Sequence, residues 1–176
     1  MRRVVFVPTV LVVALLAACG SDTPRDTATT TQGPPLFETF GDLHRDIRSD
    51  IPAAQRYFDQ GLRLAYGFNH EAAGRAFEQA ARLDPKCAIC YWGESVVLGP
   101  NVNLAMDPAL APQATALARK AQALSWHATP ADRALIDALM TRYTDPSPAD
   151  RAPLDHAYAD AMAKVVKLAQ QIAGSD

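Results

Sequence analysis

The sequence has no cluster of Lys and Arg, and its 17 basic residues are outnumbered by 19 acidic ones. A mildly acidic chain without a basic patch lacks the usual basis for binding nucleic acid or anionic lipid by charge. The sequence also lacks a Gly-rich phosphate loop and the motifs G-x-S-x-G and H-E-x-x-H, which mark nucleotide sites, serine hydrolases and zinc peptidases. The acidic residues form no paired set and are expected on solvated helix faces. These absences predict a protein that is not an enzyme and holds no cofactor.

A run long enough to span a membrane is also missing. The apolar run Val4 to Ala18 is shorter than the roughly 20 residues that a membrane-spanning helix needs. It follows two arginines and ends in the letters LAACG, the order of basic, apolar and small residues that is typical of a secretory signal. Small residues before Cys19 resemble a bacterial lipobox, which implies cleavage before Cys19 and its lipidation. An ordinary signal peptide with a chance cysteine is the alternative; on the first reading, residues 1–18 are a lipoprotein signal peptide.

The segment after Cys19 lacks any apolar residue larger than alanine. Residues 21–35 read SDTPRDTATTTQGPP and cannot bury enough surface to offset the entropy of the chain, so residues 19–35 are predicted to be a flexible tether. Loss of the leader with its two arginines lowers the 17 basic residues to 15 against 19 acidic ones, a net charge of −4. Gly20 in place of Asp gives no inner-membrane retention signal. By resemblance to enterobacterial sorting, the predicted location is the cell envelope, anchored in the outer membrane and facing the periplasm.

From residue 36 onward the chain has few β-branched runs and is rich in good helix formers. Its apolar residues recur at spacings of three and four, which predicts a single all-α domain over residues 36–176. The turn Gly67-Phe68-Asn69-His70 separates the first two helices, and Asp84-Pro85 ends the second. Thr129-Pro130-Ala131-Asp132 predicts a capping box with proline as the first helical residue. Apolar stripes from Leu135 to Tyr143 and from Leu154 to Ile172 predict two further helices.

Residues 54–87 resemble a tetratricopeptide repeat (TPR), which is about 34 residues long. The positions that match the repeat are Tyr57, Gly61, Ala73, Phe77, Ala80 and Pro85. The resemblance implies that Gly61 and Ala73 let two antiparallel helices approach closely and that Phe77 fills the groove between neighbouring hairpins. Leu64 departs from the pattern, which usually has an aromatic residue there.

Two weaker units follow this repeat. Residues 88–126 resemble a divergent repeat, in which Ser95 replaces the glycine and residues 99–108 form an insertion. Asn101 and Asn103 lie in this insertion, where they either bind a ligand or cap backbone groups. Residues 129–174 are predicted to be a further helical pair. The fold class expected from the resemblance is therefore a TPR-like α-solenoid of stacked antiparallel helical hairpins.

The chain more specifically resembles a group of exported bacterial TPR lipoproteins that share a C-x-x-C-Y-W-G motif. The matching segments are AQRYFDQGLRLAYGFNHEAAGRAF, LDPKCAICYWG, LGPNVN, DRALIDALMTRYT and LDHAYADAM. The resemblance covers about Gly41 to Lys164, and it implies a fold without implying a reaction. Members of the group continue into further repeats, so this sequence is either complete or a truncated member.

Cys87 and Cys90 are three residues apart at the start of an expected helix. A haem tether is excluded because tyrosine, not histidine, follows the pair. A disulfide is favoured because an exported chain meets an oxidising compartment and an even pair remains once the third cysteine carries lipid. Two alternatives remain open. One is a dithiol redox centre, since a helix N-terminus stabilises thiolate; the other is a zinc or copper site completed by His44 and His70.

The sequence therefore predicts a lipid-anchored envelope scaffold that binds a protein or peptide partner without catalysis. The alternative is a periplasmic redox or metal-handling module that uses Cys87 and Cys90. Nucleic acid is not an expected partner. The apolar stripe of the last helix, which includes Met162 and Val165, is expected to be covered by a second copy of the chain or by the partner itself.

Overall fold

The computed structural model describes residues 33–39 and 41–174, and all of them belong to one compact unit, Gln32–Asp176. Within these residues the chain forms helices and no β-strand, so the all-α prediction is correct. The predicted lipobox with Cys19, and the tether up to residue 32, lie outside the described residues. In the part that is described, no helix has the length and apolar character needed to cross a membrane.

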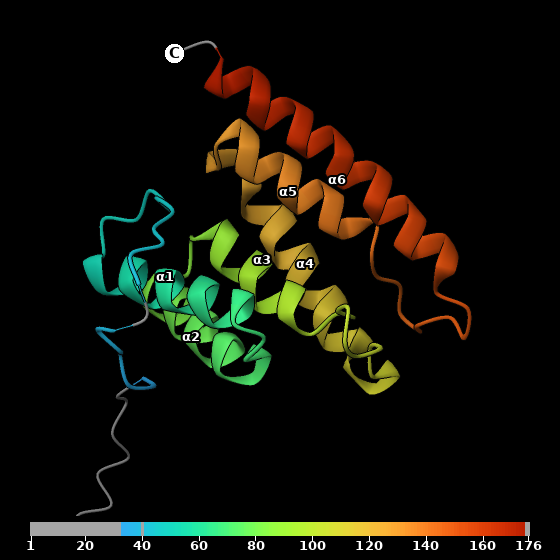
Figure 1. Ribbon diagram of the computed structural model, residues 1–176, viewed down its shortest axis with the longest axis horizontal. Coiled ribbons are helices and arrows are strands. Elements are labelled where there is room, and N and C mark those ends of the chain that lie inside the picture. The colour runs from blue at the N-terminus through green and yellow to red at the C-terminus, as the bar shows by residue number, and fades with distance from the viewer. Residues whose placement is uncertain (1–32, 40, 175–176) are drawn as a thin grey trace, which may run out of the picture. The chain divides into compact units, whose positions relative to one another are not determined.

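The helices follow one another as three antiparallel hairpins (Figure 1). The first hairpin pairs α1 (Pro52–Tyr66) with α2 (His70–Leu83), and the second pairs α3 (Ala88–Val97) with α4 (Ala111–Leu124). The third pairs α5 (Pro130–Met140) with α6 (Ala152–Ala173). Two short 3₁₀ helices, η1 (Pro108–Leu110) and η2 (Ser125–His127), flank α4.

The odd-numbered helices form one layer of the stack. Helix α3 contacts both α1 and α5, whereas the even-numbered helices of the described region do not contact one another. Helices that lie closer together on one side of a stack make that side the inner side of its curvature. We call the layer of α1, α3 and α5 the inner layer.

Local sequence sets where the helices begin and end. Thr129 caps α5 as predicted: its Oγ1 accepts the N–H of Asp132 at 3.0 Å. In place of the second bond of a capping box, Asp132 Oδ2 accepts the hydroxyl of Thr129 at 2.8 Å. Helix α5 ends at Met140, earlier than the apolar stripe predicted. Tyr143 lies in the turn that follows, where it is buried and its hydroxyl donates to the carbonyl oxygen of Ser95 at 3.0 Å. The predicted helix was too long at this end, because Tyr143 is buried by its contact with α3 and not by a place on the apolar face of α5.

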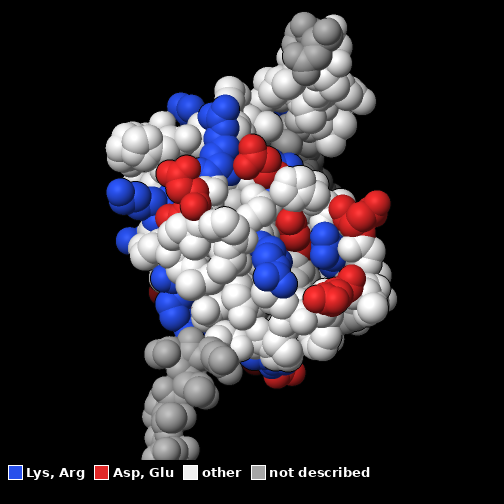
Figure 2. Space-filling model, turned by 90° about the vertical axis from the view of Figure 1, so that its left-hand side faces the viewer, with Lys and Arg blue, Asp and Glu red and all other residues white. Residues whose placement is uncertain are grey.

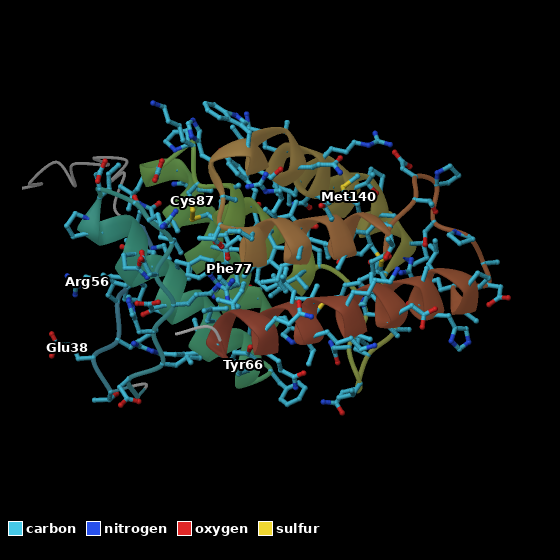
Figure 3. The ribbon with its side chains drawn as sticks, turned by 90° about the horizontal axis from the view of Figure 1, so that it is seen from above. Glu38, Arg56, Tyr66, Phe77, Cys87 and Met140 are labelled. Carbon is cyan, nitrogen blue, oxygen red and sulfur yellow. A yellow bond between two sulfur atoms is a disulfide. The ribbon has the colours of Figure 1, made fainter. Side chains whose placement is uncertain are left out.

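Phe77 fills the space where the first two hairpins meet, deep among the helices (Figure 3). A Cβ atom on Gly61 of α1 would lie 2.6 Å from the Phe77 ring, and one on Gly93 of α3 would lie 2.5 Å from it. The sequence singled out Gly61 but overlooked Gly93, because the repeat pattern puts the glycine of this helix at Ser95. Ser95 instead donates to the carbonyl oxygen of Ala114 at 2.8 Å and so joins α3 to α4.

The segment before α1 differs most from the prediction. Residues 36–51 were assigned to the helical domain, but the described residues 33–39 and 41–51 contain no helix, and the first helix begins at Pro52. Leu43 and Ile47 are four residues apart, but the segment still forms no helix. Arg48 has a φ of 55°, which interrupts any helix there. Residues 33–35, assigned to the flexible tether, already lie against the helices. We call residues 33–39 and 41–51 the strap.

Candidate binding groove on the inner helix layer

Side chains of α1 hold the backbone of the strap. Gln55 donates from Nε2 to the carbonyl oxygen of Arg45 at 2.8 Å and accepts the N–H of Ile47 at 3.0 Å. Asp59 accepts the N–H of Arg45 through Oδ1 at 3.1 Å. One turn further along, the Nε of Arg63 donates to the carbonyl oxygen of Leu43 at 2.9 Å. The spacing of four along α1 puts these polar side chains in one row.

The row continues to the beginning of the strap. Gln60 accepts the N–H of Phe37 at 2.8 Å and donates to the carbonyl oxygen of Pro35 at 2.9 Å. The strap residues whose backbone is held by α1 are therefore Pro35, Phe37, Leu43, Arg45 and Ile47. Every second residue faces the helix within each part, which is the period of an extended chain. Helix α1 thus binds an extended backbone through its side chains.

Two buried carboxylates anchor the charged part of the strap. Asp59 Oδ2 lies 2.8 Å from Nδ1 of His44, and Asp132 of α5 pairs with the guanidinium of Arg45. Both acids are buried, so the prediction that the acidic residues are scattered on solvated faces is wrong for them. No local pattern indicates these pairs, because the partners are 15 and 87 residues apart. The strap consequently spans the inner layer from α1 to α5.

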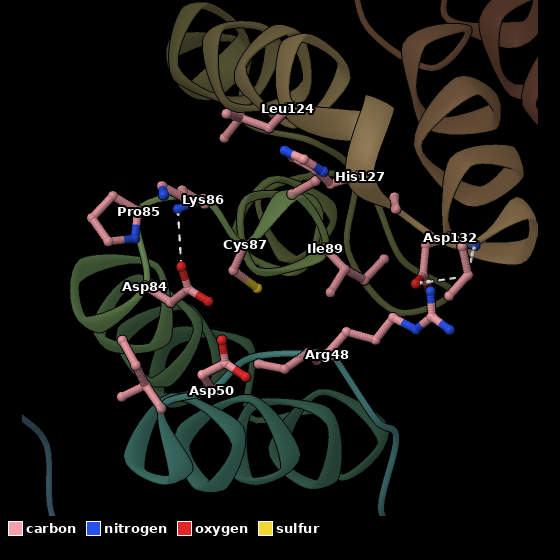
Figure 4. Close-up of a pocket in the computed structure, with 15 residues that line it drawn as sticks. Arg48, Asp50, Asp84, Pro85, Lys86, Cys87, Ile89, Leu124, His127 and Asp132 are labelled. Atoms are coloured by element: carbon pink, nitrogen blue, oxygen red, sulfur yellow. Dashed lines mark hydrogen bonds between the residues drawn. The ribbon is translucent and has the colours of Figure 1, made fainter.

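A pocket of about 600 Å³ opens beside the strap. The pocket is lined by the end of the strap, the α2–α3 turn and the first turns of α3 and α5 (Figure 4). In this view Arg48 points toward Asp132. Its wall is mixed: Ile89 and Leu124 supply apolar surface, while Asp84 and Lys86 supply charge of both signs. A pocket of this size lies within the range of known ligand sites, and no single sign of charge dominates its wall.

Cys87 and Cys90 form a disulfide at the start of α3, with their sulfurs 2.00 Å apart, in agreement with the favoured reading of the sequence. Cys87 is the N-cap residue of α3, and both cysteines are buried. Cys87 also lines the pocket. The disulfide therefore fixes the first turn of α3, which lines the pocket.

The proposed metal set is not assembled. Among residues 33–39 and 41–174, no three His, Cys, Asp or Glu side chains gather in a way that could hold a metal ion. His44 pairs with Asp59 on α1, and His70 begins α2, where its Nδ1 accepts from Asn101 Nδ2 at 3.0 Å. The two histidines lie in different parts of the chain, His44 in the strap and His70 at the start of α2, and each has a different partner.

The inserted loop is held by its own asparagine. Asn101 Oδ1 accepts the N–H of Asn103 at 2.8 Å, and its side-chain amide reaches His70 in the neighbouring turn. The sequence left two roles open for the asparagines, ligand binding and capping of backbone groups. Asn101 caps a backbone group, the N–H of Asn103. Neither residue lines the pocket beside the strap.

Charge on the strap side of the molecule is balanced. Figure 2 shows acidic and basic side chains interspersed on this face, without a continuous area of either sign. Recognition here therefore depends on individual pairs such as Arg45 with Asp132, and long-range attraction of a polyanion has no basis on this face.

Glu94 on α3 is the one carboxyl group of the described residues with a pKa raised to about 7. Burial is the main cause, the nearby Glu78 adds to it, and Arg82 opposes it. A carboxyl group with a raised pKa in the folded state makes the fold less stable as the pH rises from its unfolded pKa of 4.5 to about 7.

Glu94→Gln is expected to stabilise the protein at pH 8 and to leave its stability unchanged near pH 4. The gain at pH 8 should be on the order of 1 kcal/mol, well below the full linkage value, because the side chain is only half-buried and water screens it. Thermal unfolding of both proteins at the two pH values measures this difference. Glu71→Gln on the exposed side of α2 is the control and should show no such gain; equal behaviour of the two variants would contradict the assignment.

Comparison with family models, with curated proteins and with solved structures finds no match for the chain.

Proposed function

We propose that the protein is a lipid-anchored, periplasm-facing TPR-like scaffold of the bacterial envelope whose inner layer binds an extended segment of a protein partner. The role is non-catalytic, and the strap occupies the binding groove until a partner takes its place. The proposal combines the resemblance to exported TPR lipoproteins with the way α1 and α5 hold the strap.

The helix order supports a TPR-like arrangement. Helices α1 and α3 begin at Pro52 and Ala88, close to the length of one repeat. Phe77 packs against glycines from two successive hairpins, as the repeat pattern requires of its aromatic position. The longer interval from α3 to α5 is explained by the insertion before α4. Stacks of this kind offer an extended inner surface for binding.

The observation that carries the proposal is the alternating capture of strap backbone by α1. Side chains that satisfy both the N–H and the C=O of alternate residues can bind an extended segment of many sequences. The pair of Arg45 with Asp132 then adds a preference for a basic side chain. A partner segment that offers the same features would compete with the strap for the same groove.

A photo-crosslinking amino acid at Lys86, beside the pocket, tests this proposal in cells. We expect a crosslinked adduct of one defined mass, and we expect its yield to rise when Arg45→Ala loosens the strap. The same amino acid at Lys167 on the exposed side of α6 is the control and should give no adduct. The proposal would be contradicted by an adduct that forms equally at both positions, or by an adduct whose yield is the same with and without Arg45→Ala.

The anchoring part has its own test. Cys19→Ser is expected to move the protein from the membrane fraction to the soluble periplasmic fraction, because acyl chains bind the bilayer at about 0.8 kcal/mol for each buried methylene. Labelling with a radioactive fatty acid should be lost in the same variant. Labelling that persists in Cys19→Ser would contradict lipidation at this residue.

A periplasmic redox module remains the second candidate, favoured by one observation: Cys87 lines the pocket. Thiol–disulfide exchange requires a thiolate to reach a sulfur atom, and the burial of both cysteines argues against rapid exchange. A reduction potential in the range of periplasmic oxidoreductases, together with rapid reduction of the native protein, would favour this candidate. Resistance to reduction until the protein unfolds would favour the scaffold.

A further inference from the structure

Four large apolar side chains project from two neighbouring turns at the end of the hairpins opposite the pocket. Tyr66 and Phe68, at the α1–α2 turn, are 74% and 59% exposed, and Val102 and Leu104, in the α3–α4 loop, are 87% and 70% exposed. The hydrogen bond of Asn101 to His70 joins the two turns, which lie side by side in Figure 1. We call these four side chains the apolar tip.

The two segments that carry the tip contain no charged residue. From Leu64 to His70 and from Gly99 to Met106 there is no Asp, Glu, Lys or Arg. Turns and loops of a soluble protein are normally polar, and large apolar groups exposed together mark an interaction site. Three charged residues adjoin the two segments: Arg63 before the first, and the acids Glu71 and Asp107 after the first and the second.

The backbone of the tip also has much of its hydrogen bonding satisfied within the chain. In the first turn, the N–H groups of residues 67, 68 and 69 donate to the carbonyl oxygens of Arg63, Ala65 and Leu64. In the loop, Asn101 and Leu104 exchange N–H···O bonds, at 2.9 Å and 3.3 Å. Backbone groups that already have partners can leave water at a much lower cost than free ones.

We propose that the apolar tip inserts into the interfacial region of a zwitterionic lipid bilayer. The inference rests in part on the proposed lipid anchor, which would hold the domain at a membrane. The 15 residues from Cys19 to Gly33 span at most about 50 Å when extended, a length that would allow the domain to turn its tip to the bilayer. The two acids at its border outnumber the one arginine and so disfavour anionic lipid, which favours a headgroup without net charge.

A bilayer fits the tip better than a second copy of the chain. The four side chains expose on the order of 500 Å², less than the about 800 Å² that each partner buries in a stable protein interface. Side chains at the ends of two narrow turns form a projection, which a fluid bilayer accommodates without a matching groove. Tyrosine at the edge of such a group suits the boundary between headgroups and hydrocarbon.

Depth-dependent fluorescence quenching tests the inference with the processed chain purified from membranes. Leu104→Trp in a Trp126→Phe background reports on the tip, and the unaltered chain reports on the exposed Trp126, which lies in η2 at the opposite end of the hairpins. Trp92, which is half-buried on α3, is present in both proteins and contributes the same background to each. With vesicles of brominated phosphatidylcholine, we expect a blue shift and several-fold stronger quenching for the tip tryptophan than for Trp126. Equal quenching of both, or quenching of neither, would overturn the inference.

A second substitution separates insertion from mere proximity. Val102→Asp should abolish the extra quenching of the tip tryptophan, because an acid cannot enter the hydrocarbon at low cost. Val166→Asp, at an exposed apolar position on α6, is the matched control and should have no effect. If the chain is lipidated but the tip tryptophan is not quenched, insertion of the tip is refuted and the lipid anchor stands. If the tip tryptophan is quenched in a chain that carries no lipid, the lipid anchor is refuted and insertion of the tip stands.

Discussion

Gly93→Ala is expected to destabilise the protein by about 2 kcal/mol, in spite of the gain of up to about 1 kcal/mol that alanine normally brings to a helix. The added Cβ would lie 2.5 Å from the ring of Phe77, which is fully buried and also packs on Phe58 with ring centroids 5.4 Å apart. The ring has little room to move, because the backbone of Gly61 also lies against it: a Cβ added there would lie 2.6 Å from the same ring. Chemical unfolding followed by circular dichroism measures the loss.

Gly74→Ala on α2 provides the matched control. Its Cβ would lie 3.6 Å from Val97 Cγ2, an ordinary contact distance, so this variant should be as stable as the parent or more stable. Gly61→Ala should resemble Gly93→Ala, and Phe77→Leu combined with Gly93→Ala should recover part of the loss. If Gly93→Ala were as stable as Gly74→Ala, Phe77 would not join the first two hairpins in the way described.

Arg45→Ala combined with Ile47→Ala is expected to release the strap from the inner layer while the helices stay folded. The two changes remove the pair with Asp132 and the one strap side chain that is buried in the main apolar cluster. Together they should lower the local stability of the strap by about 3 kcal/mol. Hydrogen exchange at the N–H groups of residues 45 and 47, which donate to Asp59 and Gln55, should accelerate by about a hundredfold or more.

The helices supply the internal reference for this measurement. Exchange at backbone amides within α2 should keep its parent rate, because no strap side chain takes part in its hydrogen bonds. Arg119→Ala, at an exposed position of α4 away from the strap, is the matched surface control and should leave strap exchange unchanged. Acceleration of α2 together with the strap would mean that the strap is part of one cooperative fold and not a separable occupant of a groove.

Local patterns in the sequence predicted the helices well. Spacings of three and four residues, Gly67 with Asn69 in the first turn, and the Thr129 to Asp132 box identify helix positions without knowledge of the fold, because each depends on neighbours in the chain. Contacts within one repeat, such as Gly61 with Phe77, followed from the same short range. The disulfide of Cys87 and Cys90 could also be predicted, because the two cysteines are only three residues apart.

The groove was not predicted, because it depends on contacts between distant residues. No local pattern of the strap indicates its extended path over α1, and Asp132 meets Arg45 across 87 residues. Gly93 was overlooked because the repeat alignment assigned its role to Ser95. One signal was available: polar residues at positions 55, 59 and 63 recur at a spacing of four along α1, which indicates that this row of side chains faces polar groups or solvent.

Titration of a synthetic peptide with the sequence of residues 41–51 into the Arg45→Ala, Ile47→Ala protein tests most directly whether the inner layer binds extended segments. The account predicts saturable one-to-one binding, weakened by about tenfold or more when the arginine of the peptide that corresponds to Arg45 is replaced by alanine or when the protein carries Asp132→Asn. No binding, or equal binding of a scrambled peptide, would contradict it.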